Sequence, residues 1–508
     1  MDRRGMIGQR LITGLPGYEI TDEFRQLVKE YKVGNVILFA RNIQNPKQLK
    51  ELCNQLQELI VAQTGLPPFI AIDQEGGNLA RLHEPATVLP GAMGLGATAD
   101  PACAERAGYI TGKELLACGV NMNLAPVMDV NNNPDNPVIG ARSFSSDPDH
   151  AATMGCAWAS GLRRAGMVDC AKHFPGHGDT QVDSHLALPV IDKDLETLRS
   201  CELIPFAKAI NEGIQAVMTA HILFPELESE AVPATMSRSV LQGILRGELG
   251  FDGLIISDCM MMEAISGNYG TVDGTVAAAK AGVDLMLICH SNPLTAKACI
   301  ALDQALSNEE AEQSFRRIEK VKKKLKPNLY SLECVGCSQH LEEAERLAQQ
   351  SLTFVGGPGE QLPSLGDNPL FVGCEPYRST QAADPSSCDG NLPFTLQAHF
   401  GGRALEISPD PDEETIIRVL AHAREHTSLV MSTFNGRQLP NQRKLIESVK
   451  SLEIPVILIA MRDPFDLAGM TEKCWCIAAY DYTKLSVRTI VKALDGQIVL
   501  KGRLPVKL

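Results

Sequence analysis

The stretch Met167 to His185, MVDCAKHFPGHGDTQVDSH, joins an apolar run to a segment rich in polar side chains. The run Met167–Ala171 has the length and composition of a buried strand. The segment that follows holds a lysine, three histidines and two acids, with one proline and two glycines that shape its backbone. Loops held by a rigid scaffold often carry function, so this stretch predicts a functional site at the end of a strand.

Short apolar runs of this kind recur along the first part of the chain and alternate with segments of helical period. Such alternation is typical of parallel strands joined by helices, and start signals such as Thr21-Asp22, Asn45-Pro46, Asp100-Pro101 and Ser291-Asn292-Pro293 precede the helical segments. Eight such units over roughly 300 residues fit a (β/α)8 TIM-type barrel better than a doubly wound sheet, which the sequence alone leaves open. The predicted strands are Gln9–Thr13, Asn35–Phe39, Phe69–Ile72, Asn121–Pro126, Met167–Ala171, Ala216–Ala220, Leu254–Ser257 and Leu285–Cys289.

Polar residues follow seven of the eight predicted strands. In a barrel the carboxyl ends of the strands meet at one face, which is where the active site lies. A single aspartate at a strand end can simply cap the next helix, but polar residues at so many ends favour a shared active site. These residues are Arg41, Asp73, Asp129, Lys172 with His173, His221, Asp258 and His290.

The remainder of the chain predicts a second α/β domain. We place the catalytic barrel at 1–326, a linker at 327–338 and a smaller α/β sandwich at 339–508, because the linker lacks helical period and contains Pro327 and Gly336. No glycine-rich phosphate motif joins its strands to its helices, which argues against a nucleotide domain. Its predicted strands are Leu352–Val355, Leu370–Val372, Leu429–Ser432, Pro455–Ala460 and Cys476–Ala479, and its predicted helices are Glu413–Glu425 and Asn441–Leu452.

Composition indicates which classes of partner and which cellular compartment to expect. The formal charge of −14 over 508 residues leaves no basic stripe for a nucleic acid. No apolar run reaches the roughly 18 residues that a membrane span needs, and residues 1–13 contain no signal-peptide core, so we expect a cytoplasmic protein without membrane contact. Scattered cysteines in apolar segments agree with that, and Cys334 with Cys337 is interpreted as a linker feature rather than half a zinc site.

With these residues in view, the chain resembles glycoside hydrolase family 3, and within it the β-N-acetylglucosaminidase branch. Four motifs occur in the order in which the family has them. They are DQEGG at 73–77 with Arg81-Leu82, NLAPVMDV at 123–130 with 136–144, KHFPGHGDTQVDSH at 172–185, and Ser257-Asp258. The Asp-Ser-His ending of the third motif is the mark of that branch, and residues 480–483 and 502–506 resemble the family's C-terminal domain.

The resemblance also implies roles for individual residues. Asp258 is implied as the nucleophile, and His185 as the acid/base with Asp183 as its partner. The implied binders of the terminal sugar are Asp73, Arg81, Arg142, Lys172 and His173. The resemblance implies no metal and no cofactor, and the second domain is left with a structural or oligomer-forming role.

The chemistry of sugar transfer suits these residue types. Displacement at the anomeric carbon needs a negative group against that carbon and an acid for the departing oxygen. An imidazole titrates near working pH, and the carboxylate of Asp183 can fix the tautomer of His185. We interpret His177 and His221 as structural hydrogen-bonding residues, and Met260, Met261 and Met262 either as an adaptable apolar wall or as packing beneath the strand end.

We therefore predict an exo-acting retaining β-N-acetylglucosaminidase that acts on peptidoglycan fragments in cell-wall recycling or on chito-oligosaccharides, as a monomer or a homodimer. A histidine acid/base would not repel an anion, so a phosphorylase that uses phosphate as acceptor is the alternative. Two further alternatives are a metal-dependent hydrolase with His173, His177, Asp183 and His185 as ligands, and a sugar-binding protein without catalysis.

Overall fold

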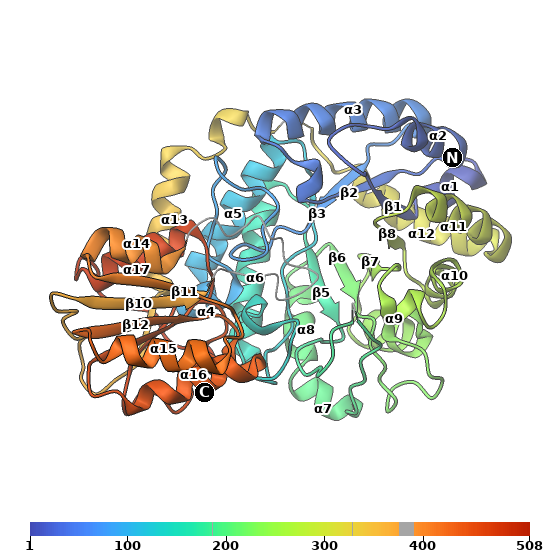
Figure 1. Ribbon diagram of the computed structural model, residues 1–508. Helices are drawn as coiled ribbons and strands as arrows, with labels where there is room; N and C mark the ends of the chain where they lie inside the picture. The colour runs from blue at the N-terminus through green and yellow to red at the C-terminus, as the bar shows by residue number, and fades with distance from the viewer. Residues whose placement is uncertain (185, 328, 375–390) are drawn as a thin grey trace.

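The computed structural model describes residues 1–184, 186–327, 329–374 and 391–508, and its strands form two separate sheets (Figure 1). The first sheet contains eight parallel strands in the order β4-β3-β2-β1-β8-β7-β6-β5. Each of the eight predicted strands overlaps one of them, so the predicted barrel is confirmed. The strands are β1 (Leu11–Gly14), β2 (Asn35–Leu38), β3 (Phe69–Ile72), β4 (Met122–Asn123), β5 (Cys170–Phe174), β6 (Ala216–Thr219), β7 (Leu254–Cys259) and β8 (Leu285–Ile288).

Irregular backbone joins the two ends of this sheet. β4 is only two residues long, but bridges pair Met122 with Val168 and Val127 with Lys172. The backbone N–H of Cys170 donates to the carbonyl of Ala125 over 3.0 Å, and that of Lys172 donates to Pro126 over 3.1 Å. The sheet is therefore tied across its seam next to the stretch on which the sequence prediction centred.

The fifth strand is shifted relative to the prediction. The predicted strand ended at Ala171, whereas β5 runs from Cys170 to Phe174, so that Lys172 and His173 lie on the strand and not in the loop after it. Polar side chains tolerate this buried position because carboxylates at the mouth of the barrel pair with both of them. A pattern of apolar residues cannot show such partners.

The barrel helices begin where the start signals predicted. The side chains of Thr21, Asn45, Asp100 and Ser291 each accept a hydrogen bond from the first turn of their helix. The helices of this part of the chain are α1 (Arg3–Gly8), α2 (Asp22–Tyr31), α3 (Pro46–Thr64), α4 (Ala92–Ala97), α5 (Pro101–Ala117), α6 (Pro148–Ala165), α7 (Leu195–Ser200), α8 (Leu203–Asn211), the π-helix η4 (Ser239–Glu248), α9 (Glu263–Ser266), α10 (Thr271–Ala281), α11 (Asn292–Ala305) and α12 (Asn308–Lys322). In the parts of the chain that the structure describes, no helix combines the length and the apolar character needed to cross a bilayer.

The second sheet has the strand order β11-β10-β12-β13-β14-β9, and only β9 runs antiparallel to its neighbour. The sequence prediction missed β11, because this edge strand carries Arg403 and Glu406 on an exposed surface and lacks an apolar run. The strands are β9 (Thr353–Gly356), β10 (Pro369–Cys374), β11 (Arg403–Ile407), β12 (Ser428–Thr433), β13 (Val456–Ala460) and β14 (Trp475–Ala478). The helices are α13 (Ser338–Ser351), α14 (Leu392–Phe400), α15 (Glu413–Ala423), α16 (Pro440–Ser448) and α17 (Lys484–Leu494).

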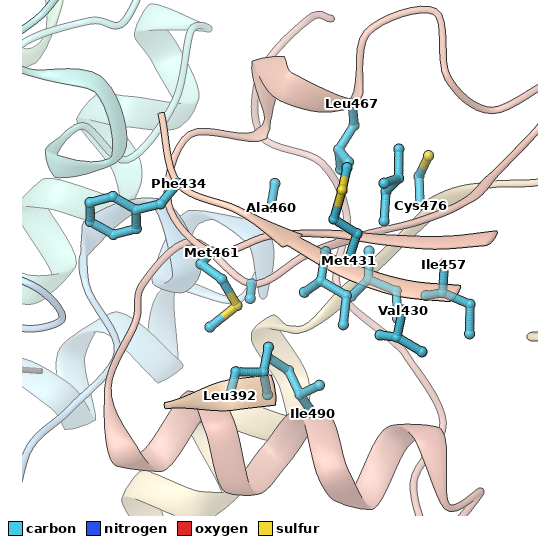
Figure 2. Packing of buried hydrophobic residues seen from close by; sticks show 14 of the residues in the cluster. Leu392, Val430, Met431, Phe434, Ile457, Ala460, Met461, Leu467, Cys476 and Ile490 are labelled. Atoms are coloured by element: carbon cyan, nitrogen blue, oxygen red, sulfur yellow. The ribbon is translucent and has the colours of Figure 1, made fainter. Parts of the chain in front are cut away.

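The second domain has a continuous apolar core, part of which is shown in Figure 2. Val430 of β12 and Ile457 of β13 lie between the sheet and Ile490 of α17 (Figure 2). Met93 and Ala97 of α4 belong to the same cluster, so this core extends into the barrel domain.

Replacing Ile457 by alanine tests this packing. Because Ile457 is fully buried, we expect Ile457→Ala to lower the free energy of unfolding by about 2–5 kcal/mol and Ile457→Val by about 0.5–1.5 kcal/mol. Denaturant unfolding followed by circular dichroism measures both values. Equal, small losses for the two variants would contradict the packing in Figure 2.

Candidate active site

A cavity of about 600 Å³ lies at the carboxyl ends of the barrel strands. Asp258 at the end of β7 lines it, as do all five predicted sugar binders, which are Asp73, Arg81, Arg142, Lys172 and His173. Asp183 is buried beside Ser184, which also lines the cavity. His185 lies outside the described residues, so its predicted role stays a prediction.

The floor of this cavity holds an ion-pair network made of Asp73, Glu75, Arg142 and Lys172. Lys172 Nζ lies 2.7 Å from Asp73 Oδ1 and 2.7 Å from Glu75 Oε1. Arg142 donates through Nε to Glu75 Oε2 and through a terminal nitrogen to Glu75 Oε1, both over 2.9 Å. This bidentate pair fixes the plane of the Arg142 guanidinium. Because Lys172 pairs with Asp73 as well as with Glu75, its ammonium group lies between two carboxylate acceptors.

Opposite charges in the network shift the pKa values of their partners towards the ionised forms. Burial by itself would raise the pKa of Glu75, but the charges of Arg142 and Lys172 and their hydrogen bonds hold that pKa well below its ordinary value. Burial likewise opposes the charge of Lys172, and the carboxylates of Asp73 and Glu75 outweigh it and raise the pKa of the lysine. Glu75, Arg142 and Lys172 are therefore charged at neutral pH, and the formal charges of the two cations and the two carboxylates cancel.

A second network orients His173. Its Nδ1 lies 2.7 Å from Asp129 Oδ2, and Asp129 Oδ1 accepts the backbone N–H groups of His173 (3.1 Å) and His177 (2.8 Å). Burial would raise the pKa of Asp129, but the charge and hydrogen bonds of His173 lower it. Asp129 therefore binds Nδ1 of His173, so Nε2 is the ring nitrogen that this carboxylate does not bind.

His177 holds the loop that follows β5. Its Nδ1 lies 2.9 Å from Thr180 Oγ1 and its Nε2 lies 3.1 Å from Ser184 Oγ. Burial, reinforced by the neighbouring charge of His173, lowers the pKa of His177 to about 4. A neutral imidazole between two hydroxyls agrees with the structural role predicted for it, although His177 also lines the cavity.

Asn136 anchors the same loop from the opposite side. Its Nδ2 donates to the carbonyls of His177 (2.9 Å) and Gly178 (3.0 Å), and its Oδ1 accepts from Val138 and Ile139. Gly178 lies so close to Val130 that a β-carbon would stand 1.7 Å from the Val130 carbonyl oxygen, so only glycine fits there.

The remaining predicted residues divide into two groups. Arg41 and His290 line the cavity, whereas His221 bonds to Thr235 Oγ1 (2.8 Å) and to the carbonyl of Cys259 (3.1 Å), which supports a structural role. Met260 is fully buried as packing, whereas Met261 and Met262 line the cavity, so the two interpretations of the methionines each hold for part of the run.

Glu75 is the main site residue that sequence reasoning did not single out. It lies inside the quoted DQEGG motif, but nothing in its neighbours along the chain shows that it pairs with Arg142 and Lys172. The only available signal was its distance of two residues from Asp73 after a strand. Among the described residues, no group of three or more potential ligands is arranged to hold a metal ion, and the cysteines are free thiols.

The family model described as "Glycosyl hydrolase family 3 N terminal domain" matches residues 6–321. The chain belongs to glycoside hydrolase family 3. The predictions of family, of fold and of a glycoside hydrolase enzyme are thereby confirmed.

Two solved structures and one sequence relative place the chain within the family. A family 3 beta-N-acetylglucosaminidase from Paenibacillus sp. str. FPU-7 is 36% identical, with a TM-score of 0.92, over 100% of this chain and 99% of that one. NagZ from Neisseria gonorrhoeae is 30% identical over 67% of this chain and 98% of that one, with a TM-score of 0.58. Beta-hexosaminidase A of Pseudoalteromonas piscicida is 38% identical over 381 residues, which are 69% of this chain and 63% of that protein.

Glu75→Gln tests the ion-pair network. Glutamine lacks the negative charge that Arg142 and Lys172 share. Breaking a buried ion pair in this way lowers the free energy of unfolding by about 3–5 kcal/mol. We therefore expect a large loss in the free energy of unfolding, measured by urea denaturation. The control is Glu105→Gln in the exposed pair with Arg164, for which we expect less than about 1 kcal/mol. Similar small losses for both would show that Glu75 is not a shared counter-ion.

The pH dependence of stability tests the neutral state of His177. Its folded pKa of about 4 lies below the ordinary 6.5, so the unfolded chain binds a proton first as the pH falls. The contribution of this pKa difference to the free energy of unfolding is complete above pH 6.5 and is lost as the pH falls towards 4. Relative to His177→Gln, the wild type should lose about 2 kcal/mol of unfolding free energy between pH 7 and pH 5. Parallel stability curves for the two proteins would contradict a buried neutral imidazole.

Proposed function

We propose that this glycoside hydrolase is an exo-acting retaining β-N-acetylglucosaminidase that releases a terminal N-acetylglucosamine through a covalent glycosyl-enzyme intermediate. The relatives named beta-hexosaminidase and the beta-N-acetylglucosaminidase structure support this activity. The observation that carries it is the position of Asp258, whose carboxylate shares one cavity with the ion-pair network and His173.

The network suits a neutral sugar. The charges of Lys172 and Arg142 are balanced by Asp73 and Glu75, so the floor of the cavity presents strong hydrogen-bonding groups without net charge. Hydroxyl and acetamido groups match such a surface, and Arg81 at the cavity wall adds a donor.

In the proposed first step, an oxygen of Asp258 forms a bond to the anomeric carbon while the bond from that carbon to the departing oxygen breaks. The departing oxygen takes a proton from His185, which Asp183 orients. In the second step water attacks the anomeric carbon, His185 accepts a proton from that water, and Asp258 leaves as a carboxylate. Two displacements give net retention of configuration.

The finer assignments are also proposals. Peptidoglycan fragments in cell-wall recycling and chito-oligosaccharides are the proposed substrates, and we propose a cytoplasmic monomer or homodimer with a catalytic barrel at 1–326, a linker at 327–338 and a second domain at 339–508. The phosphorylase alternative has less support, because the beta-glucoside phosphorylase structures are only 22–23% identical and share the fold alone.

The test of Asp258 uses an aryl β-N-acetylglucosaminide as substrate. We expect Asp258→Gly to lower kcat on the order of 10⁴-fold or more, because the nucleophile is lost. Azide added to this variant should then yield the α-glycosyl azide, whereas the wild type should yield β-N-acetylglucosamine as its first product. Undiminished turnover in Asp258→Gly, or an α-anomer from the wild type, would refute the proposed mechanism.

A parallel reaction distinguishes hydrolysis from phosphorolysis. Incubating the wild type with the same substrate in phosphate and in a phosphate-free buffer should give free N-acetylglucosamine in both. Accumulation of a sugar 1-phosphate only in phosphate buffer would support the alternative acceptor instead.

A further inference from the structure

The second domain contacts the loops that carry the ion-pair network. In Figure 1 this domain lies beside α4, and its apolar core includes Met93 of α4. The segments after β12, β13 and β14 reach two barrel loops, one at 75–91 after β3 and one at 135–142 after β4. These loops provide Glu75 and Arg142 respectively.

One of these contacts involves Asp463, in the segment after β13. Asp463 is buried, and its Oδ1 accepts the backbone N–H of Ala141 over 2.7 Å. A β-carbon on Gly140 would stand 2.4 Å from the same oxygen, so the carboxylate fits against bare backbone. In the amide orientation that satisfies its neighbours, Asn435 donates to Asp463 Oδ2 over 2.8 Å. Both carboxylate oxygens of Asp463 therefore accept a hydrogen bond, one from Ala141 and the other from Asn435.

Arg142 follows Ala141 directly in the short helix η2 (Gly140–Arg142). The carboxylate of Asp463 fixes the backbone of η2, and the side chain of Arg142 then makes its bidentate contact with Glu75. The bond from Ala141 to Asp463 thus connects the second domain to a cavity residue through a single peptide unit.

A second contact acts on the loop that contains Asp183 through Asn136. Asp466 accepts the backbone N–H groups of Gly436 (2.9 Å) and Arg437 (2.8 Å), which fixes the segment after β12. From this segment Gln438 donates to the carbonyl of Asn136 over 3.3 Å. Asn136 in turn anchors the loop after β5 through the carbonyls of His177 and Gly178.

A third contact reaches the loop after β3. The backbone N–H of Tyr482 donates to Asn78 Oδ1 over 2.9 Å, and the carboxylate of Asp481 accepts the N–H of Gly91 over 3.3 Å. Asn78 lies between Glu75 and Arg81 along the chain. Both partners of the Glu75–Arg142 pair are therefore carried by loops that the second domain holds.

We propose that the second domain positions the active site, and that Asp463 is the positioning residue that sets Arg142 for the terminal sugar by holding the backbone N–H of Ala141. This inference rests on the proposed function for its substrate and extends it, because it gives the second domain a role in catalysis without contact between its own side chains and the sugar. Asp463 acts only through Arg142.

The test compares Asp463→Ala with Asp463→Asn. The alanine variant loses the acceptor for Ala141, and we expect KM for the aryl β-N-acetylglucosaminide and Ki for N-acetylglucosamine to rise about tenfold, with a smaller change in kcat. The asparagine variant keeps an oxygen acceptor for Ala141 but loses the acceptor for Asn435, so it should restore part of the affinity. Unchanged KM and Ki in folded Asp463→Ala would overturn the proposal.

A double-mutant cycle separates positioning from general destabilisation. If Asp463 acts through Arg142, Asp463→Ala should raise Ki in the wild-type background but not in an Arg142→Ala background. An equal rise in Ki in both backgrounds would overturn the proposal. Ile457→Val serves as the control, since it weakens the core of the second domain without touching the barrel loops, and its KM and Ki should equal those of the wild type.

Hydrogen exchange keeps this test independent of the proposed function. Backbone amides of residues 139–142 should exchange faster in Asp463→Ala than in Ile457→Val, whichever substrate the enzyme takes. Equal exchange would overturn the positioning role. A wild type that fails to cleave the glucosaminide while Asp463→Ala still accelerates exchange would refute the proposed function and leave the contact between the domains established.

Discussion

The candidate active site depends on one buried carboxylate, that of Glu75, which Arg142 and Lys172 share. Two cations at the floor of a cavity would repel each other and would resist burial if no acid lay between them. The arrangement has a geometric result as well, because the three residues come from the loop after β3, the loop after β4 and strand β5. The pairing of their charges therefore fixes three separate pieces of backbone relative to one another.

The polar residues around this pair are satisfied in the same way, by partners from distant segments. Asp129 orients His173, Asn136 holds the loop with His177, and Asp463 holds the backbone next to Arg142. Each is a buried acceptor or donor with a fixed partner, as buried polar groups must be. Such a site is rigid where the sugar would lie, and the loop that contains Asp183 is attached to this rigid part through side chains.

The sequence allowed much of this to be predicted. Apolar runs gave all eight barrel strands, side-chain caps gave the helix starts, and polar residues after the strands gave part of the cavity lining, including Asp258, Arg41 and His290. The edge strand β11 escaped because Arg403 and Glu406 interrupt its apolar residues, and the shift of β5 escaped because the partners of Lys172 lie elsewhere in the chain. The contact of Ala141 with Asp463 spans 322 residues, and no local pattern encodes a pairing over that distance.

The internal cancellation of charge has a kinetic consequence. The protein carries a formal charge of −14, yet the floor of its cavity pairs each cation with a carboxylate. A neutral chito-oligosaccharide carries no net charge on which the field of the protein could act, and the balanced floor adds no steering, so its encounter rate should be governed by diffusion and orientation. Ionic strength, which screens surface charges within a few ångströms at high salt, should leave both capture of the sugar and release of the product almost unchanged.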